Sequence, residues 1–179
     1  MMQTLDLVYI AIGAALITVC AWITIPTTVP FTLQTFAVFF VLLLLGGVRG
    51  TMAVAVYILL GAVGVPVFSG FNSGVGVLVG STGGYIIGFL LMGLLYILFT
   101  RLLGEKIAVK IAALVLGLAV CYAFGTAWFL YVYVRSKGTV GVLTVLSWCV
   151  FPFVLPDIGK LTLAVLVTKR VKPFIRERQ

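Results

Sequence analysis

The chain has 179 residues, of which 63% are hydrophobic and only 9% are charged, and its formal net charge is +8. A soluble globular domain is about half apolar and a quarter charged, so this composition excludes a water-soluble protein and indicates a membrane protein. Because a spanning helix needs roughly 17–25 apolar residues, the chain has room for about six spans in a single transmembrane domain, residues 1–179.

Turns rich in glycine, proline or charge divide the chain into six apolar blocks. The second and third blocks are short for full spans, so we expect these helices to be tilted or to lie where the bilayer is thin. The segment 140–155, which contains Pro152 and Pro156, fits either part of a span or an interfacial piece packed on protein. The sequence therefore predicts an all-α membrane protein with six transmembrane helices. Their approximate bounds are 5–24, 31–46, 51–65, 77–100, 107–134 and 152–168.

An even number of spans places both termini on the same side of the membrane. The termini and the two turns on their side carry nine lysine and arginine residues, whereas the opposite turns carry only Arg135 and Lys137. By the positive-inside rule, this asymmetry predicts cytoplasmic termini. We expect the basic tail 169–179 to contact lipid headgroups or a cytoplasmic partner, so the positive charge serves membrane lipid rather than nucleic acid. The nine residues are Arg49, Arg101, Lys106, Lys110, Lys169, Arg170, Lys172, Arg176 and Arg178.

In this topology two uncharged turns face outward, IPTTVPFTLQT (25–35) and VPVFSGFNSG (65–74). They are rich in proline, threonine, serine and glycine, and they contain Phe31, Phe68 and Phe71. Such turns offer hydrogen bonds beside aromatic surface, as a site for a small, partly apolar molecule requires. The alternative is that they are simply tight turns.

The last apolar block contains two opposite charges, Asp157 and Lys160, which share a helix face because they are three residues apart. Pro156 is tolerated near a helix start, so we expect Asp157 in the first turn, where the helix dipole favours a carboxylate. The pair would then lie in the outer part of the membrane.

Insertion of an Asp or Lys at the centre of a membrane span costs roughly 2.5–3.5 kcal/mol. The presence of the Asp157–Lys160 pair in an apolar block therefore indicates a structural or functional role. It is either a structural salt bridge or part of a ligand or ion path, which intramembrane charges commonly mark. A carboxylate acceptor beside an ammonium donor suits a ligand that presents both N–H and C=O, such as a ureido group.

Other chemistry has little support in the sequence. The chain contains no histidine and only four acidic residues, so we expect no metal site, no cofactor and no catalytic residues. It has no GxxxxGK[ST] loop, so energy for any active transport would come from another subunit. We expect the cysteines to be buried thiols. A stand-alone channel or ion-coupled carrier that uses Asp157, and an intramembrane enzyme, remain alternatives. The cysteines are Cys20, Cys121 and Cys149.

Small residues recur at helical spacing in the first block, where Ala11 and Ala15 form one i,i+4 pair and Ala14 and Thr18 form another. Such faces let helices approach closely, either within the chain or against another membrane subunit. The segment 69–89 carries seven glycines, which also permit close approach. Tyr85 in this segment either stacks on a flat ligand or belongs to the interfacial aromatic belt.

Several of these stretches together resemble the BioY family, the biotin-specific S components of energy-coupling factor (ECF) transporters. The resemblance covers nearly the whole chain in the right order, with one departure, Ser81, where the family pattern GPTGGY has proline. The stretches are PFTLQTFAVFFVLLLLGGVRG (30–50), YILLGAVGVPVFSG (57–70), GSTGGYIIGF (80–89) and PDIGK (156–160).

The resemblance implies a high-affinity biotin receptor in a prokaryotic cell membrane, with a six-helix S-component bundle and no enzymatic activity of its own. It implies a pocket near the outer face and two kinds of partner, a transmembrane coupling subunit (the T component) and a pair of cytoplasmic ATPases. Docking on the coupling subunit maps to Ala11 and Ala15. An S component for a different vitamin remains an alternative. The implied biotin contacts are Asp157, Lys160, Tyr85, Asn72 and Gln34.

Overall fold

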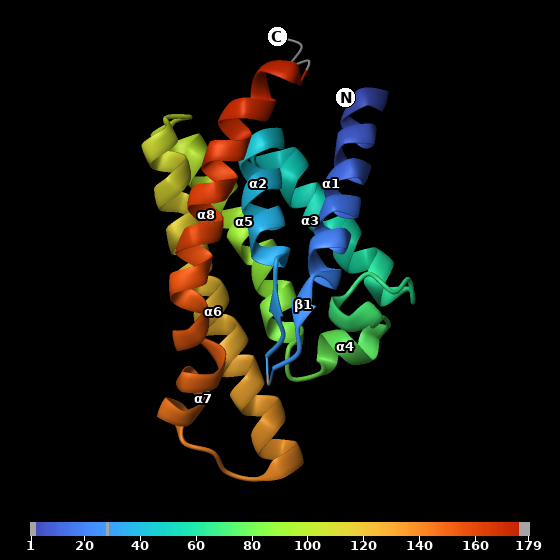
Figure 1. Cartoon of the computed structure of the whole chain (residues 1–179), viewed down its shortest axis with the longest axis vertical. Helices are drawn as coiled ribbons and strands as arrows, with labels where there is room; N and C mark the ends of the chain where they lie inside the picture. The colour runs from blue at the N-terminus through green and yellow to red at the C-terminus, as the bar shows by residue number, and fades with distance from the viewer. Residues whose placement is uncertain (1–2, 28, 176–179) are drawn as a thin grey trace.

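The structure is a computed structural model that describes residues 3–27 and 29–175 of the chain. The helices are α1 (Thr4–Trp22), α2 (Gln34–Leu45), α3 (Gly47–Ala62), α4 (Val75–Val79), α5 (Gly83–Leu103), α6 (Ile107–Lys137), α7 (Val142–Cys149) and α8 (Phe151–Val171), with 3₁₀ turns at Ser69–Phe71 and Lys172–Phe174. They form an elongated bundle in which the start of α1 and the end of α8 lie at the same end (Figure 1).

Each of the six predicted blocks contains a helix, which confirms a mostly helical membrane protein. In the described part of the chain, four helical segments are long and apolar enough to cross a bilayer, namely α1, α5, α6, and α7 together with α8. Helices α2 and α3 have only 12 and 16 residues, fewer than the roughly 17–25 that a full span needs. Four helical segments, rather than six, therefore have the length of a span.

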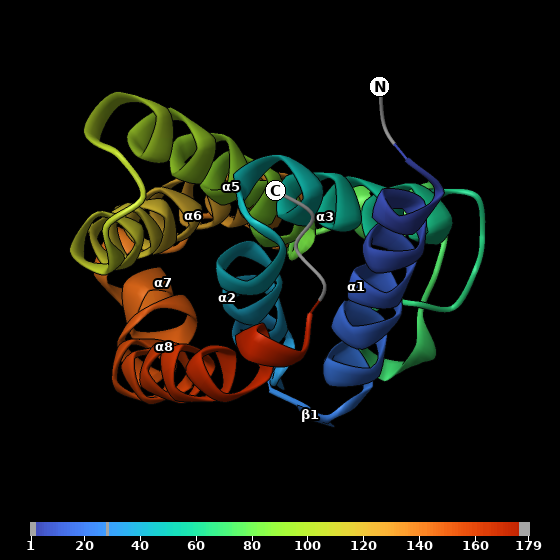
Figure 2. The same cartoon turned by 90° about the horizontal axis from the view of Figure 1, so that it is seen from above.

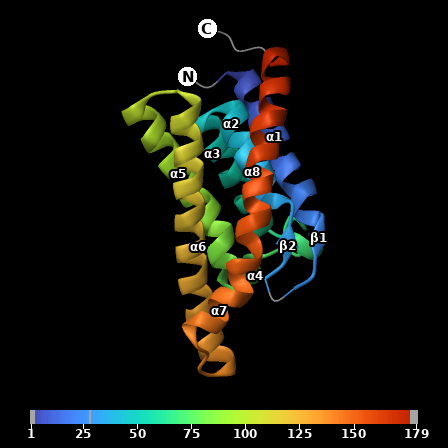
Figure 3. The same ribbon diagram turned by 60° about the vertical axis from the view of Figure 1, so that its left-hand side comes forward.

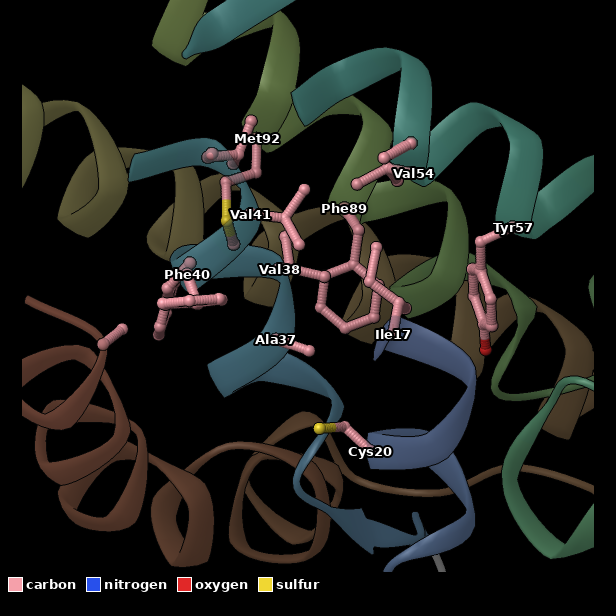
Figure 4. Packing of buried hydrophobic residues seen from close by; sticks show 14 of the residues in the cluster. Ile17, Cys20, Ala37, Val38, Phe40, Val41, Val54, Tyr57, Phe89 and Met92 are labelled. Atoms are coloured by element: carbon pink, nitrogen blue, oxygen red, sulfur yellow. The ribbon is translucent and has the colours of Figure 1, made fainter. Parts of the chain in front are cut away.

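Helix α2 lies at the centre of the bundle, which explains why its sequence is apolar on all sides after Thr35. It is surrounded by the other long helices when the bundle is seen from above (Figure 2), and ten of its residues are buried. A helix that is apolar on all sides belongs in a core. Val38 and Val41 pack there with Ile17 of α1 and with Phe89 and Met92 of α5 (Figure 4).

Glycines let α5 and α6 pack closely along their length. A Cβ atom on Gly88 would lie 2.7 Å from the Cys121 sulfur, and one on Gly125 would lie 2.2 Å from the Tyr85 ring. Close approach of this kind is typical of small residues between membrane helices. The glycine run thus helps to pack the helices that carry Tyr85 and Cys121.

Most of the segment 140–155 is helical, as α7 and the start of α8 with a turn at Val150 between them, and both pack against α6 (Figure 3). Helix α8 begins at Phe151, with Pro152 in its first turn and Pro156 inside the helix. The prediction that Asp157 lies in the first turn, next to the positive end of the helix dipole, was therefore wrong. The first of the two prolines, rather than the second, occupies the helix start where proline is tolerated.

Two other predicted boundaries also shift. The block 31–46 begins not as helix but as strand β2 (Phe31–Thr32), which pairs antiparallel with β1 (Thr24–Ile25). The block 77–100 begins in α4 and is interrupted at 80–82 before α5 starts. The hairpin connects the end of α1 to the start of α2 and positions Phe31 and Thr32 beside the site described below.

Most of the basic residues gather at one end of the bundle. The α2–α3 turn, the α5–α6 turn, the start of α1 and the end of α8 lie together (Figure 1). The end of α6, whose last turn carries Arg135, lies at the other end. Of the nine residues counted on the termini side, Arg176 and Arg178 are outside the described residues, as is the end of the basic tail.

Candidate ligand-binding site

A cavity lies beside the β hairpin, between α2, α5, α6 and α8. Its volume is about 140 Å³, roughly ten times the space that one water molecule needs, so it suits a small organic molecule. Most of the lining is apolar or aromatic, as is usual for ligand sites. The lining residues are Val29, Pro30, Thr32, Gln34, Thr35, Phe68, Ser69, Asn72, Val77, Thr82, Tyr85, Ile86, Phe89, Leu118, Cys121, Tyr122, Cys149, Phe153, Asp157 and Lys160.

Asp157 and Lys160 form a buried ion pair in the wall of this cavity. Lys160 Nζ lies 2.7 Å from Asp157 Oδ1, and the two residues are only 8% and 2% exposed. A charge of either sign is costly to bury alone and is tolerated when paired and hydrogen-bonded. The spacing seen in the sequence therefore does place the two groups in contact on one face of α8.

Three further side chains complete this cluster. The Tyr122 hydroxyl of α6 donates a hydrogen bond of 2.5 Å to Asp157 Oδ2. Lys160 Nζ donates to Thr35 Oγ1 of α2 at 3.3 Å, and it also lies 4.4 Å from the centroid of the Phe31 ring, within cation–π range. The cluster thus joins α2, α6, α8 and the hairpin across the cavity.

The cluster keeps hydrogen-bonding capacity for a ligand. Each Asp157 oxygen accepts one hydrogen bond from the protein, and a carboxylate oxygen has two lone pairs. The Thr35 hydroxyl accepts from Lys160 and retains its own proton. The site can therefore accept N–H groups at Asp157 and donate to a carbonyl oxygen from Thr35.

The other three predicted contacts, Tyr85, Gln34 and Asn72, line the same cavity from different elements. The Tyr85 hydroxyl shares a hydrogen bond of 3.0 Å with Thr126 Oγ1, and Gln34 Nε2 donates to the Tyr57 hydroxyl at 3.0 Å. Both side chains are thereby fixed at the cavity wall. Asn72 is exposed and marks the outer part of the lining.

Sequence reasoning missed Tyr122 and Thr35, which contact the ion pair directly. A tyrosine in an apolar span needs a partner for its hydroxyl, and that requirement was the available signal for Tyr122. The prediction of buried, unpaired thiols is confirmed for all three cysteines. Two of them, Cys121 and Cys149, line the cavity.

The two small-residue faces of α1 have different environments. Ala14 and Thr18 are buried against the rest of the bundle, and Gly13 beside them lies so close to α3 that a Cβ atom there would be 2.9 Å from Ala53 Cβ. Ala11 and Ala15 are exposed and do not line the cavity. Internal packing therefore accounts for the first pair and not for the second.

Comparison with known proteins identifies the family. The sequence model of the BioY family matches residues 1–177. The chain is 44% identical over 174 residues to the biotin transporter BioY of Thermotoga maritima, covering 97% of this chain and 99% of that protein. It is 35% identical over 173 residues to a probable biotin transporter BioY of Pyrococcus horikoshii, covering 96% and 98%.

A solved structure agrees with this assignment. The fold matches the crystal structure of an S-component for biotin from an ECF-type ABC transporter with a TM-score of 0.81 and 25% sequence identity, covering 97% of this chain and 95% of that one. The relatives are named as transporters, in line with the expectation of a transport subunit rather than an enzyme. From the sequence match and the fold together, the chain belongs to the BioY family.

Proposed function

We propose that the chain is the biotin-binding membrane subunit, or S component, of an ATP-driven ECF-type vitamin transporter. The relatives named as biotin transporters and the matching S-component structure support the assignment. The observation that carries it is the buried Asp157–Lys160 pair in the wall of a cavity of small-molecule size.

Biotin has a ureido ring that carries two N–H groups and one carbonyl oxygen. The carboxylate of Asp157 accepts from one of the ureido N–H groups, and the Thr35 hydroxyl, supported by Lys160, donates to the carbonyl oxygen. Apolar side chains, including Phe68 and Phe153 of the lining, cover the fused rings. Buried polar groups of the protein that lose such partners are left unsatisfied, which makes the site selective.

The same proposal includes the membrane topology. With α2 and α3 as short crossings, of which α2 is buried in the bundle, α1, α2, α3, α5, α6 and α8 make six passes through a prokaryotic cell membrane. The gathering of basic residues at the end that holds both termini supports a cytoplasmic location for that end. The cavity, beside the hairpin in the other half, then opens toward the outside.

Two kinds of partner follow from the assignment, a transmembrane coupling subunit and cytoplasmic ATPases. Ala11 and Ala15 are exposed on α1, and their small side chains would let a helix of the coupling subunit approach closely. Val8, Ile12 and Val19 beside them are 47%, 59% and 49% exposed, so this face of α1 meets either lipid or that partner.

The test is equilibrium binding of radiolabelled biotin to the purified protein in detergent, with riboflavin and desthiobiotin as competitors. We expect saturable binding at nanomolar concentrations, weaker competition by desthiobiotin and none by riboflavin. Binding of another vitamin in place of biotin would keep the S-component fold and overturn the substrate. Biotin uptake by the chain without any ATPase would favour the stand-alone carrier that uses Asp157.

A further inference from the structure

Tyr57 of α3 lies behind the wall of the cavity rather than in it. The residue is completely buried and is not among the described residues that line the cavity. Its side chain projects from α3 into the core, with the hydroxyl directed away from the helix (Figure 4). Two of its contacts are nevertheless with residues of the lining, so Tyr57 can act on the ligand site through other side chains.

The first of these contacts is a hydrogen bond with Gln34, the first residue of α2. Gln34 lines the cavity, and its Nε2 donates to the Tyr57 hydroxyl at 3.0 Å. In the part of the chain that the structure describes, this is the hydrogen bond that the Gln34 amide makes. Because a tyrosine hydroxyl both donates and accepts, it holds the amide in either orientation. Without this anchor the glutamine side chain would have to be ordered when the ligand binds, which lowers affinity.

The second contact is with the ring of Phe68, which also lines the cavity. The Tyr57 and Phe68 rings meet edge to face, with centroids 5.5 Å apart and planes at 82°, a favourable geometry for an aromatic pair. Gly61, one turn further along α3, leaves room for the same ring, since a Cβ atom there would lie 2.0 Å from Phe68 Cζ. One face of α3 thus supports Phe68 from behind.

A second buried tyrosine shows what is particular to Tyr57. Tyr96 of α5 is equally buried, does not line the cavity, and its hydroxyl has no hydrogen-bond partner among the described residues. The bundle therefore tolerates a buried tyrosine hydroxyl that holds nothing. The Tyr57 hydroxyl differs because its partner is a residue of the ligand site.

We propose, on the basis of the function proposed above, that Tyr57 is a positioning residue of the biotin site. Its hydroxyl holds the Gln34 amide and its ring holds Phe68 before the ligand arrives. Tyr57 thereby raises biotin affinity without contacting biotin, because side chains that are already ordered lose less conformational freedom on binding.

The experiment is a double-mutant cycle on the full chain in detergent, with biotin affinity measured by isothermal titration calorimetry. Tyr57→Phe removes the hydroxyl and keeps the ring, and we expect it to weaken biotin binding about three- to tenfold. In a Gln34→Met background, where no amide remains to be held, the same change should weaken binding less than about twofold.

The cycle separates positioning from a general effect on stability. A loss of stability would weaken binding to the same extent in both backgrounds, whereas an effect through Gln34 requires the amide. The matched control is Tyr96→Phe, which removes a hydroxyl from an equally buried ring outside the cavity lining and should leave biotin affinity unchanged. Unfolding temperatures of all variants confirm that each is folded when binding is measured.

Four results would overturn the inference while leaving the proposed function intact. They are normal biotin affinity of Tyr57→Phe, an equal loss in both backgrounds, an equal loss in Tyr96→Phe, and loss of the fold in Tyr57→Phe, which would make the hydroxyl a purely structural group. Absence of biotin binding to the unmodified chain would instead overturn the proposed function, and the inference with it.

Discussion

The Tyr122 hydroxyl and the Asp157 carboxylate are joined by a hydrogen bond of 2.5 Å that connects α6 to α8 across the cavity. Because Lys160 holds the other carboxylate oxygen, Asp157 is fixed at both oxygens before any ligand arrives. A carboxylate oriented in this way binds a ligand without an additional ordering cost. The predictions below test whether this cluster serves binding, folding or both.

Single changes in the ion pair should weaken biotin binding strongly. We expect Asp157→Asn and Lys160→Ala each to reduce affinity by tenfold or more, about 1.4 kcal/mol or above, because each leaves the opposite buried charge without its partner. Radioligand binding measures the effect. Asp6→Asn is the matched control, since Asp6 pairs with Arg49 outside the cavity and its loss should leave affinity unchanged.

A double replacement separates binding from folding. A buried ion pair replaced by apolar residues of similar size is often neutral or stabilising, so Asp157→Leu combined with Lys160→Met should unfold at a higher temperature than either single variant. The same protein should show no biotin binding. A double variant that still binds biotin with normal affinity would mean that the pair is purely structural.

Removal of the Tyr122 hydroxyl should also weaken biotin binding. Tyr122→Phe deletes one hydrogen bond to a carboxylate, which contributes roughly 1.5–3 kcal/mol, so we expect an affinity loss of about tenfold with the fold retained. Tyr131→Phe on the same helix is the control, because Tyr131 is 54% exposed. Equal affinities of the two variants would remove Tyr122 from the site.

The position of the Tyr85 ring depends on a glycine of the neighbouring helix. Gly125→Ala would bring a Cβ atom to 2.2 Å from Tyr85 Cδ1, so the ring must move and we expect biotin affinity to fall at least several-fold. Gly159→Ala is the same change on an exposed turn of α8 where nothing lies within 4 Å. It should preserve binding and raise the unfolding temperature, given the higher helix propensity of alanine.

A bulky residue on the exposed face of α1 should block assembly without affecting biotin. Ala15→Trp is expected to leave the affinity of the isolated chain unchanged and to abolish co-purification with the coupling subunit and the ATPases. Val115→Trp tests an equally apolar surface on α6, since Val115 is 52% exposed, and should assemble normally. Retention of the complex by Ala15→Trp would move the docking surface away from this face.

Much of the fold follows from local sequence patterns. Apolar blocks bounded by glycine, proline and charge mark where membrane helices begin and end, and a helix was found in every predicted block. The start of α8 was misplaced because Pro152 and Pro156 are both compatible with a first turn, and the local sequence does not select between them. The hairpin depends on pairing between Thr24 and Thr32, which short loop sequences do not reveal.

The site was predictable only where its residues are close in sequence. Asp157 and Lys160 are three residues apart on one helix, so their contact follows from helix geometry. Tyr122 and Thr35 reach the pair from α6 and α2, and nothing in their local sequence indicates which helices adjoin α8. For the same reason, spacing alone did not distinguish the buried Ala14 from the exposed Ala15.

The central claim, that the Asp157 cluster binds the ureido head of biotin, is tested most directly by changing the ligand. The measurement compares the affinity of the purified chain for biotin with its affinity for biotin methylated on both ureido nitrogens. We predict at least a roughly tenfold loss for the methylated ligand, because Asp157 loses an N–H donor and meets a methyl group. Equal affinity for the two ligands would contradict the assignment.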